Sequence, residues 1–163
     1  MARIADLPPA HRLFLRLYPF RRLDPIPWTL LAKPLAECRV ALVTSAAYYA
    51  PDQEPFDELV RGGDSSFRVI DVAESTHALE RLRTSHRSTA FDPDGIRADY
   101  NLALPVDRFR ELEARGGIGS LHHEALSFMG AVTAPGRLRR VSAPRAAERL
   151  RMGDVDVVFL CPV

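Results

Sequence analysis

Two short stretches of the chain are apolar at almost every position. One is Val40 to Val43, and the other runs from Val155 to Leu160, broken only by Asp156. Apolar runs rich in β-branched residues are typical of strands that are buried on both faces of a parallel sheet. We therefore predict a strand over residues 39–45 and a second, equally buried strand over residues 155–160.

The intervening chain contains helical patterns. Apolar residues recur at helical spacing over residues 106–114, and Ser142 followed by Pro144 predicts the start of a helix over residues 144–152. Alternation of strand, helix and strand is the order found in α/β sheets. The pattern thus predicts a three-layer α/β fold with a mostly parallel sheet, Rossmann-like or flavodoxin-like in architecture.

The remaining segments have weaker patterns. We expect a strand over residues 66–72, a helix over 74–83, a long polar loop over 84–100 and a short strand over 101–104. Residues 1–37 are expected to form an N-terminal helix, ending before Pro19, and a proline-rich arm. Residues 38–163 are expected to form a single α/β domain.

Composition and charge narrow the classes of function. The 163 residues are 47% apolar and 26% charged, which is ordinary for a globular protein. The net charge is +1, so charge provides no general attraction to nucleic acid or to a membrane. No apolar stretch approaches the roughly 20 residues of a membrane-spanning helix, and the N-terminus lacks the apolar core of a signal peptide. We expect a cytoplasmic protein that binds neither nucleic acid nor membrane.

The cysteines and histidines indicate no structural metal or disulfide. Two cysteines are too few for a disulfide framework or a four-cysteine zinc site. Cys38 opens one predicted strand and Cys161 closes another, at opposite edges of a parallel sheet, which argues against a bond between them. The pair His122 and His123 suggests a metal, but adjacent residues on a strand or helix point apart, so no metal site is predicted.

Several segments occur in the same order as in a known family. They are LDPIPWTLLAKPLAECRVALVTSA, QEPFD, GDSSFRVI, SHRSTAFD, DYNLALPVDRFRELEARGGIGSL, LSFMG and VDVVFLCPV. The likeness extends over nearly all of residues 23–163, and the ordered set PVDRFREL, GGIGSL and SFMG is its most specific part. On these segments the chain resembles the glycine/sarcosine/betaine reductase selenoprotein B family, which is related to the D-proline reductase selenoprotein.

The resemblance implies where redox chemistry belongs. In that family the last strand is followed by a proline-containing turn and then by a reactive cysteine or selenocysteine, with a second cysteine three positions later. Pro162 and Val163 match the turn, so the resemblance implies a reactive residue immediately after Val163. We therefore expect a sequence truncated at a UGA selenocysteine codon, inactive alone, without the reactive residue, its helix and a last strand. The alternative is a genuine stop with loss of activity.

If a helix is missing, the last predicted strand or its neighbours should expose an apolar patch. The same strand carries Cys161, three positions before the implied reactive residue. That spacing allows Cys161 to act as a resolving thiol, and the alternative is a small apolar side chain that only packs. Thr44 and Ser45 end the 39–45 strand at the same sheet edge, where they either bind a substrate carboxylate or cap the loop.

Two further residues are candidates for the site. His86, in the long polar loop, is a candidate general acid for a leaving amine, with a surface histidine as the alternative. Arg108 is a candidate partner for a substrate carboxylate or for Asp99. Ser127 matches the family segment SFMG, but the resemblance implies no role for it.

Members of the resembled family reductively cleave a carbon–nitrogen bond. In their complexes the substrate amine is released, and the carbon fragment passes to selenium on a partner selenoprotein. The resemblance implies an oxidoreductase subunit that acts on a small amine or amino-acid-like substrate, with selenocysteine in place of a bound cofactor. Its implied partners are other reductase subunits or a thioredoxin-like electron donor. The alternative is a non-catalytic α/β binding or complex subunit that retains the scaffold.

Overall fold

The computed structural model describes residues 5, 7–18, 24–27, 29–88 and 91–163, and the chain divides into two units, Met1–Leu30 and Leu31–Val163. In the first unit, helix α1 spans Pro9–Leu17. It begins at a proline, whose restricted φ suits the first helical turn, and it lies within the N-terminal segment where a helix is predicted. Part of the predicted proline-rich arm, residues 19–23 and 28, lies outside the described residues.

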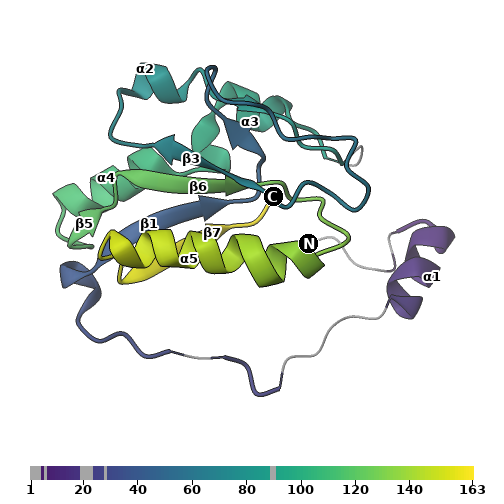
Figure 1. Ribbon diagram of the computed structural model, residues 1–163, viewed down its shortest axis with the longest axis horizontal. Helices are drawn as coiled ribbons and strands as arrows, with labels where there is room; N and C mark the ends of the chain where they lie inside the picture. Colours follow the sequence, from purple (N-terminus) through teal and green to yellow (C-terminus); the bar gives the residue numbers. More distant parts are fainter. Residues whose placement is uncertain (1–4, 6, 19–23, 28, 89–90) are drawn as a thin grey trace. The chain divides into compact units, whose positions relative to one another are not determined.

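The second unit is built on a five-stranded sheet (Figure 1). Its strands are β1 (Arg39–Thr44), β3 (Phe67–Asp71), β5 (Ser120–Leu121), β6 (Glu124–Phe128) and β7 (Val157–Cys161). Strand β7 pairs parallel with one edge of β1, while β5 and β6 follow one another, also parallel, along its other edge. Strand β3 pairs antiparallel with β6. A separate antiparallel pair joins β2 (Tyr48–Tyr49) to β4 (Arg83–Thr84).

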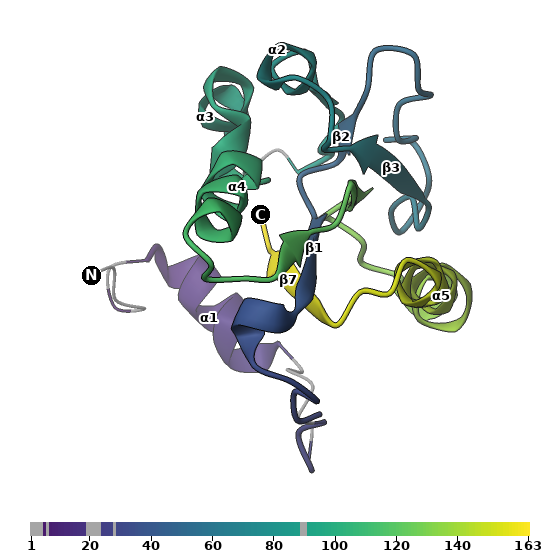
Figure 2. The ribbon, with the colours of Figure 1, turned by 90° about the vertical axis from the view of Figure 1, so that its left-hand side faces the viewer.

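Helices cover both faces of this sheet, as Figure 2 shows. On one face lie α3 (Asp94–Ala98) and α4 (Val106–Ala114), and on the other lies α5 (Ala143–Met152), preceded by the π-helical turn η4 (Leu138–Ser142). Each face has its own apolar core. The α4 face includes Leu42, Ile70, Leu104, Val106 and Ala125, and the α5 face includes Ala41, Leu126, Ala146 and Leu150. The predicted three-layer α/β fold with a mostly parallel sheet is confirmed.

Strand β7 departs from the prediction. Among the described strands it pairs only with β1, so its other edge has no strand beside it. Three of its apolar side chains are exposed: Val158 at 39%, Phe159 at 45% and Leu160 at 67%. The prediction that residues 155–160 are buried on both faces is therefore wrong, because an apolar run alone does not say whether a strand is central. Apolar side chains are thus exposed on both faces of this strand.

Other segments also differ from their predictions. Residues 101–104 are not a strand, because the Asp99 carboxylate accepts the Asn101 N–H and starts the 3-10 turn η3 (Tyr100–Leu102). The polar loop over 84–100 contains α3, and the helix predicted over 74–83 is limited to α2 (Thr76–Leu79). A further 3-10 turn, η2 (Leu35–Glu37), leads into β1. In the described part of the chain, helices are too short or too polar to cross a membrane.

Candidate functional site

Three side chains form a row across the carboxyl ends of the parallel strands. Thr44 of β1 is the register partner of Ser127 of β6 on one side and of Cys161 of β7 on the other. Two positions earlier, Leu42 and Ala125 lie in the α4-face core, and Phe159 stacks on Phe109 of α4 at 5.0 Å between ring centroids. Because alternate residues of a strand share a face, the hydroxyls of Ser127 and Thr44 and the thiol of Cys161 lie on the α4 face.

Ser45 holds the segment that follows β7. Its backbone N–H donates to the Cys161 carbonyl at 3.1 Å, which continues the β1–β7 ladder by one residue. Its hydroxyl then accepts the Val163 N–H at 2.9 Å. The turn after β7 is thus fixed against the end of β1 by both the backbone and the side chain of one serine.

His86 reaches the same edge from the loop after β4. Its Nδ1 accepts the Ser88 N–H at 3.3 Å, so the neutral ring carries its proton on Nε2. The ring stacks on Phe91 with centroids 4.5 Å apart. Burial lowers the pKa of His86, which favours the neutral ring at pH 7. Within the described residues, the buried Nε2 atom has no hydrogen-bond partner.

Gly130 shows how closely these segments approach one another. A Cβ atom at Gly130 would lie 2.6 Å from His86 Nε2, 2.8 Å from the Ser45 carbonyl oxygen and 3.1 Å from the Val163 carbonyl oxygen. Contacts this short are not tolerated, so only glycine allows the loop after β6 to pass here. The ends of β1 and β7, the His86 loop and the Gly130 loop therefore converge on one place.

The groups at this place differ in what they can do chemically. Thr44 is 1% exposed, and its hydroxyl accepts the Ala46 N–H at 3.1 Å, so it already caps the loop. Ser127 is 0% exposed, and its hydroxyl has no partner among the described residues. Burial raises the pKa of the Cys161 thiol, so this thiol is protonated at neutral pH. The site thus holds a neutral thiol. It also holds two hydrogen-bond donors, the Ser127 hydroxyl and the His86 Nε2–H, which have no acceptor among the described residues.

Arg108 lies apart from this row. Its Nη2 pairs with Glu111 Oε1 at 2.7 Å within the exposed surface of α4. The expected pairing with Asp99 is wrong, because Glu111 lies one helical turn away and the Asp99 side chain is used in starting η3. The structure therefore brings Thr44, Ser45, His86 and Cys161 together at the carboxyl ends of the parallel strands. It leaves Arg108 outside that group.

The histidine pair lies at the other end of the sheet. The rings of His122 and His123 are tilted with centroids 4.4 Å apart. The two rings are therefore closer than expected for adjacent residues, whose side chains were predicted to point apart. Ligand-type atoms of these residues and of Glu124 all lie within 4.8 Å of one another. The Glu124 carboxylate is already bound by both arms of the Arg149 guanidinium, at 2.7 and 2.5 Å. A cation would have to compete with that arginine, so we assign no metal here.

Two members of the site were not predicted to take part. Gly130 follows the SFMG segment, but its role depends on contacts with residues more than 30 positions away in the sequence, which no local pattern reveals. Ser127 could have been found from the sequence, because a polar side chain in the apolar stretch of β6 is a signal that the site needs it. Cys38, by contrast, is buried at the opposite end of β1, so the two free cysteines lie far apart along the strands, as predicted.

Comparison with known proteins identifies relatives of this chain. The chain is 31% identical over 133 residues to the D-proline reductase subunit gamma of Acetoanaerobium sticklandii, which covers 82% of this chain and 52% of that subunit. It is 32% identical over 149 residues to the glycine reductase complex component B subunit gamma of Symbiobacterium thermophilum, covering 88% of this chain and 32% of that subunit. It is also 29% identical over 131 residues to the betaine reductase complex component B subunit beta of Peptoclostridium acidaminophilum, covering 78% and 28%.

The chain thus spans about half the length of the D-proline reductase subunit and about a third of the glycine and betaine reductase subunits. No solved structure matches it. The model of one protein family, described as glycine/sarcosine/betaine reductase selenoprotein B, matches residues 10–162. This match extends over nearly the whole chain and includes the strands that form the row of Ser127, Thr44 and Cys161. The chain belongs to the glycine/sarcosine/betaine reductase selenoprotein B family.

Proposed function

We propose that this protein is an oxidoreductase subunit that takes part in the reductive cleavage of a carbon–nitrogen bond in a small amine or amino-acid-like substrate. The observation that carries the proposal is the convergence of Cys161, Ser45 and His86 on the turn after β7, where the resembled family has its redox residue. Family membership supports the reductase class, and relatives named as complex components support a role within an assembly.

The redox centre belongs at the position next to Val163. A selenol or thiol there would supply the nucleophile, and a selenol is ionised at neutral pH because it is more acidic than a thiol, whose reference pKa is about 8.5. The two hydrogen-bonding groups of Ser45 would hold that position at the carboxyl edge of β1. The His86 Nε2–H lies on the same side and would donate a hydrogen bond to the reacting group; His86 would protonate the leaving amine only from its imidazolium form, which its lowered pKa disfavours at pH 7.

Cys161 suits a resolving role better than a nucleophilic one. Because burial raises its pKa, its thiol stays protonated until a neighbouring group accepts the proton. Its sulfur would then attack the selenium of a selenium–carbon adduct. The sulfur–selenium bond forms as the selenium–carbon bond breaks, the carbon fragment leaves with the bonding electron pair and takes up the proton released by the thiol, and an external dithiol would reduce the sulfur–selenium bond and become a disulfide. The Ser127 hydroxyl would bind the substrate carboxylate, while the Ser45 hydroxyl holds the turn at Val163 and Thr44 keeps its hydroxyl on the Ala46 N–H.

The first test is the nucleotide sequence beyond the Val163 codon. A UGA followed in frame by a cysteine codon three positions later supports the proposed centre, whereas UAA or UAG favours a non-catalytic subunit that retains the scaffold. The second test is labelling of the protein translated through that codon with limiting iodoacetamide at pH 6 and pH 8, read by mass spectrometry. One group after β7 should react at pH 6, and Cys161 should react mainly at the higher pH. If nothing reacts faster than an ordinary cysteine, the catalytic proposal is wrong.

A further inference from the structure

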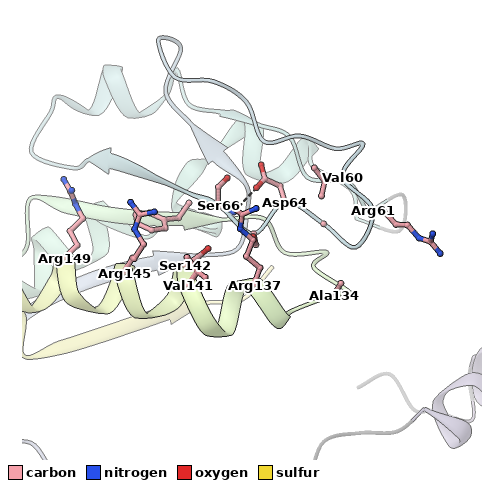
Figure 3. Close-up of a pocket in the computed structure, with 13 residues that line it drawn as sticks. Val60, Arg61, Asp64, Ser66, Ala134, Arg137, Val141, Ser142, Arg145 and Arg149 are labelled. Carbon is pink, nitrogen blue, oxygen red and sulfur yellow. Dashed lines mark hydrogen bonds between the residues drawn. The ribbon is translucent and has the colours of Figure 1, made fainter.

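A groove of about 600 Å³ lies on the α5 face of the sheet, between residues 60–67 and the helix formed by η4 and α5 (Figure 3). The row of Ser127, Thr44 and Cys161 lies on the α4 face, so the sheet separates it from this groove. Most charged side chains that line the groove are basic. The charged residues are Arg61, Arg137, Arg145, Arg149 and Asp64.

Side chains that line the groove, most of them basic, recur at a regular spacing along the helix. Arg137, Val141, Arg145 and Arg149 recur every four residues, so they lie along one side of the helix. They flank the buried stripe that attaches the helix to the sheet, which consists of Ser142, Ala146 and Leu150. At about 1.5 Å per residue, this row extends about 18 Å along the groove. The positively charged groups therefore lie in a row along the groove, which suits an extended ligand.

Only part of this charge is neutralised within the chain. Arg149 binds Glu124 through two hydrogen bonds. Asp64, the acidic residue of the lining, accepts the backbone N–H groups of Asp57 and Ser66. Arg137 and Arg145 form no ion pair within the described ranges of the chain, and both point into the groove in Figure 3. Two guanidinium groups at the centre of the groove thus have no carboxylate partner among these residues.

We propose that this groove binds an extended acidic segment of a partner polypeptide. Arg137 and Arg145 are eight residues apart, about 12 Å along a helix, which matches the roughly 13 Å between residues i and i+4 of an extended strand. Residues i, i+2 and i+4 of such a strand point the same way. Val141, 42% exposed, lies between the two arginines, so the segment has carboxylates at i and i+4 and an apolar side chain at i+2.

The partner assignment rests on the proposed function, because relatives of this chain are named as components of multi-subunit reductase complexes. The binding itself needs no redox group. A failure to bind an acidic segment would therefore leave the iodoacetamide result unaffected, and the two proposals can fail separately. A small polyanion is the competing ligand, but a line of charge this long favours an extended one.

The test uses the full chain and a fluorescein-labelled peptide in which two glutamates flank a leucine at alternate positions. Binding is followed by fluorescence anisotropy at about 20 mM and 150 mM salt, because screening weakens exposed ion pairs. We expect Arg137→Gln and Arg145→Gln each to weaken binding about threefold, and the double variant about tenfold. The matched control is the double variant Arg97→Gln and Arg115→Gln, which removes the same charge from the α3 and α4 face and should change the affinity less than about twofold.

Circular dichroism first establishes that each variant is folded. The proposal is overturned if the control double variant weakens binding as much as the groove variants do, because the attraction would then be general. It is also overturned if a peptide with glutamine in place of both glutamates binds equally well. If pyrophosphate binds with the same dependence on Arg137 and Arg145 while the peptide does not bind, the groove is a site for small anions and the assignment to a polypeptide is wrong.

Discussion

The Val163 N–H donates a hydrogen bond to the Ser45 hydroxyl at 2.9 Å, across 118 positions of sequence. This bond joins the turn after β7 to the end of β1, at the centre of the candidate site. We expect Ser45→Ala to reduce the free energy of unfolding by about 0.5–1.5 kcal/mol, the usual net value of one hydrogen bond. It should also speed the alkylation of Cys161, because the turn beside this thiol is then held only by the backbone hydrogen bond from Ser45.

Urea unfolding and the rate of iodoacetamide labelling measure these two effects. Ser65→Ala serves as the control, because the structure gives the Ser65 side chain no hydrogen bond to a described residue. If both variants label Cys161 at the rate of the unmodified protein, the Ser45 hydroxyl does not hold the turn.

Gly130 should be intolerant of any side chain. Its added Cβ would lie 2.6 Å from His86 Nε2 and 2.8 Å from the Ser45 carbonyl, so Gly130→Ala should cost about 1–3 kcal/mol of unfolding free energy. Replacing His86 by alanine as well removes one of these contacts and should recover part of the loss. Equilibrium unfolding of the two single variants and the double variant measures this coupling.

Gly95→Ala is the matched control for that cycle. Gly95 lies in helix α3, and its added Cβ would meet only the Leu102 side chain, at 3.4 Å. Alanine is a better helix former than glycine, so this change should be neutral or stabilising. A loss at Gly130 no larger than at Gly95 would mean that the loop after β6 does not approach His86.

The Glu124–Arg149 pair should contribute to pH dependence. The hydrogen bonds from Arg149 hold the pKa of the Glu124 carboxyl below its usual value of 4.5. Because the pKa is depressed in the folded protein, the stabilisation is complete above about pH 4.5 and is lost as pH falls through the folded pKa. Glu124→Gln should therefore lower stability at pH 7 by about 0.5–1 kcal/mol, and the difference should shrink as the pH falls below 4.5. Urea unfolding across this range, with Glu113→Gln as the control, measures the effect; a difference independent of pH contradicts it.

Two leucines on the strands at either side of β1 should respond differently to substitution. Leu126 of β6 is 0% exposed, so Leu126→Ala should cost about 2–5 kcal/mol. Leu160 of β7 is 67% exposed, so Leu160→Ser should change stability by less than about 0.5 kcal/mol and should reduce the binding of a hydrophobic dye. If both substitutions lower the free energy of unfolding in urea by the same amount, the Leu160 side chain is buried rather than exposed to solvent.

The sequence predicts the individual helices and strands better than it predicts which strands pair and in which direction. Strand β1 and helices α4 and α5 follow from local periodicity, which depends only on neighbouring residues. The edge position of β7 and the antiparallel direction of β3 depend on pairings between distant segments, and an apolar run looks the same in either case. Residues 101–104 were misread because the Asp99 carboxylate starts a turn there.

The same distinction applies to the candidate site. That Thr44, Ser45 and Cys161 share one edge follows from strand direction, since parallel strands end together. The inclusion of His86 and the close approach of Gly130 depend on how two loops cross that edge, and the sequence contains no signal for this. Arg108 was a candidate because of its charge, but Glu111, one turn later on the same helix, binds it.

The pairing of β1 with β7 also affects the order in which the protein folds during synthesis. Arg39, at the start of β1, donates its backbone N–H to the Asp156 carboxylate, 117 residues later in the chain. Such distant contacts form slowly because a long loop must close first. The central strand β1 therefore leaves the ribosome long before β7 has been synthesised. Until then, the edge of β1 that will pair with β7 has no partner, and the apolar residues beside it are unpaired. Binding of a chaperone to the nascent chain would be most useful during that interval.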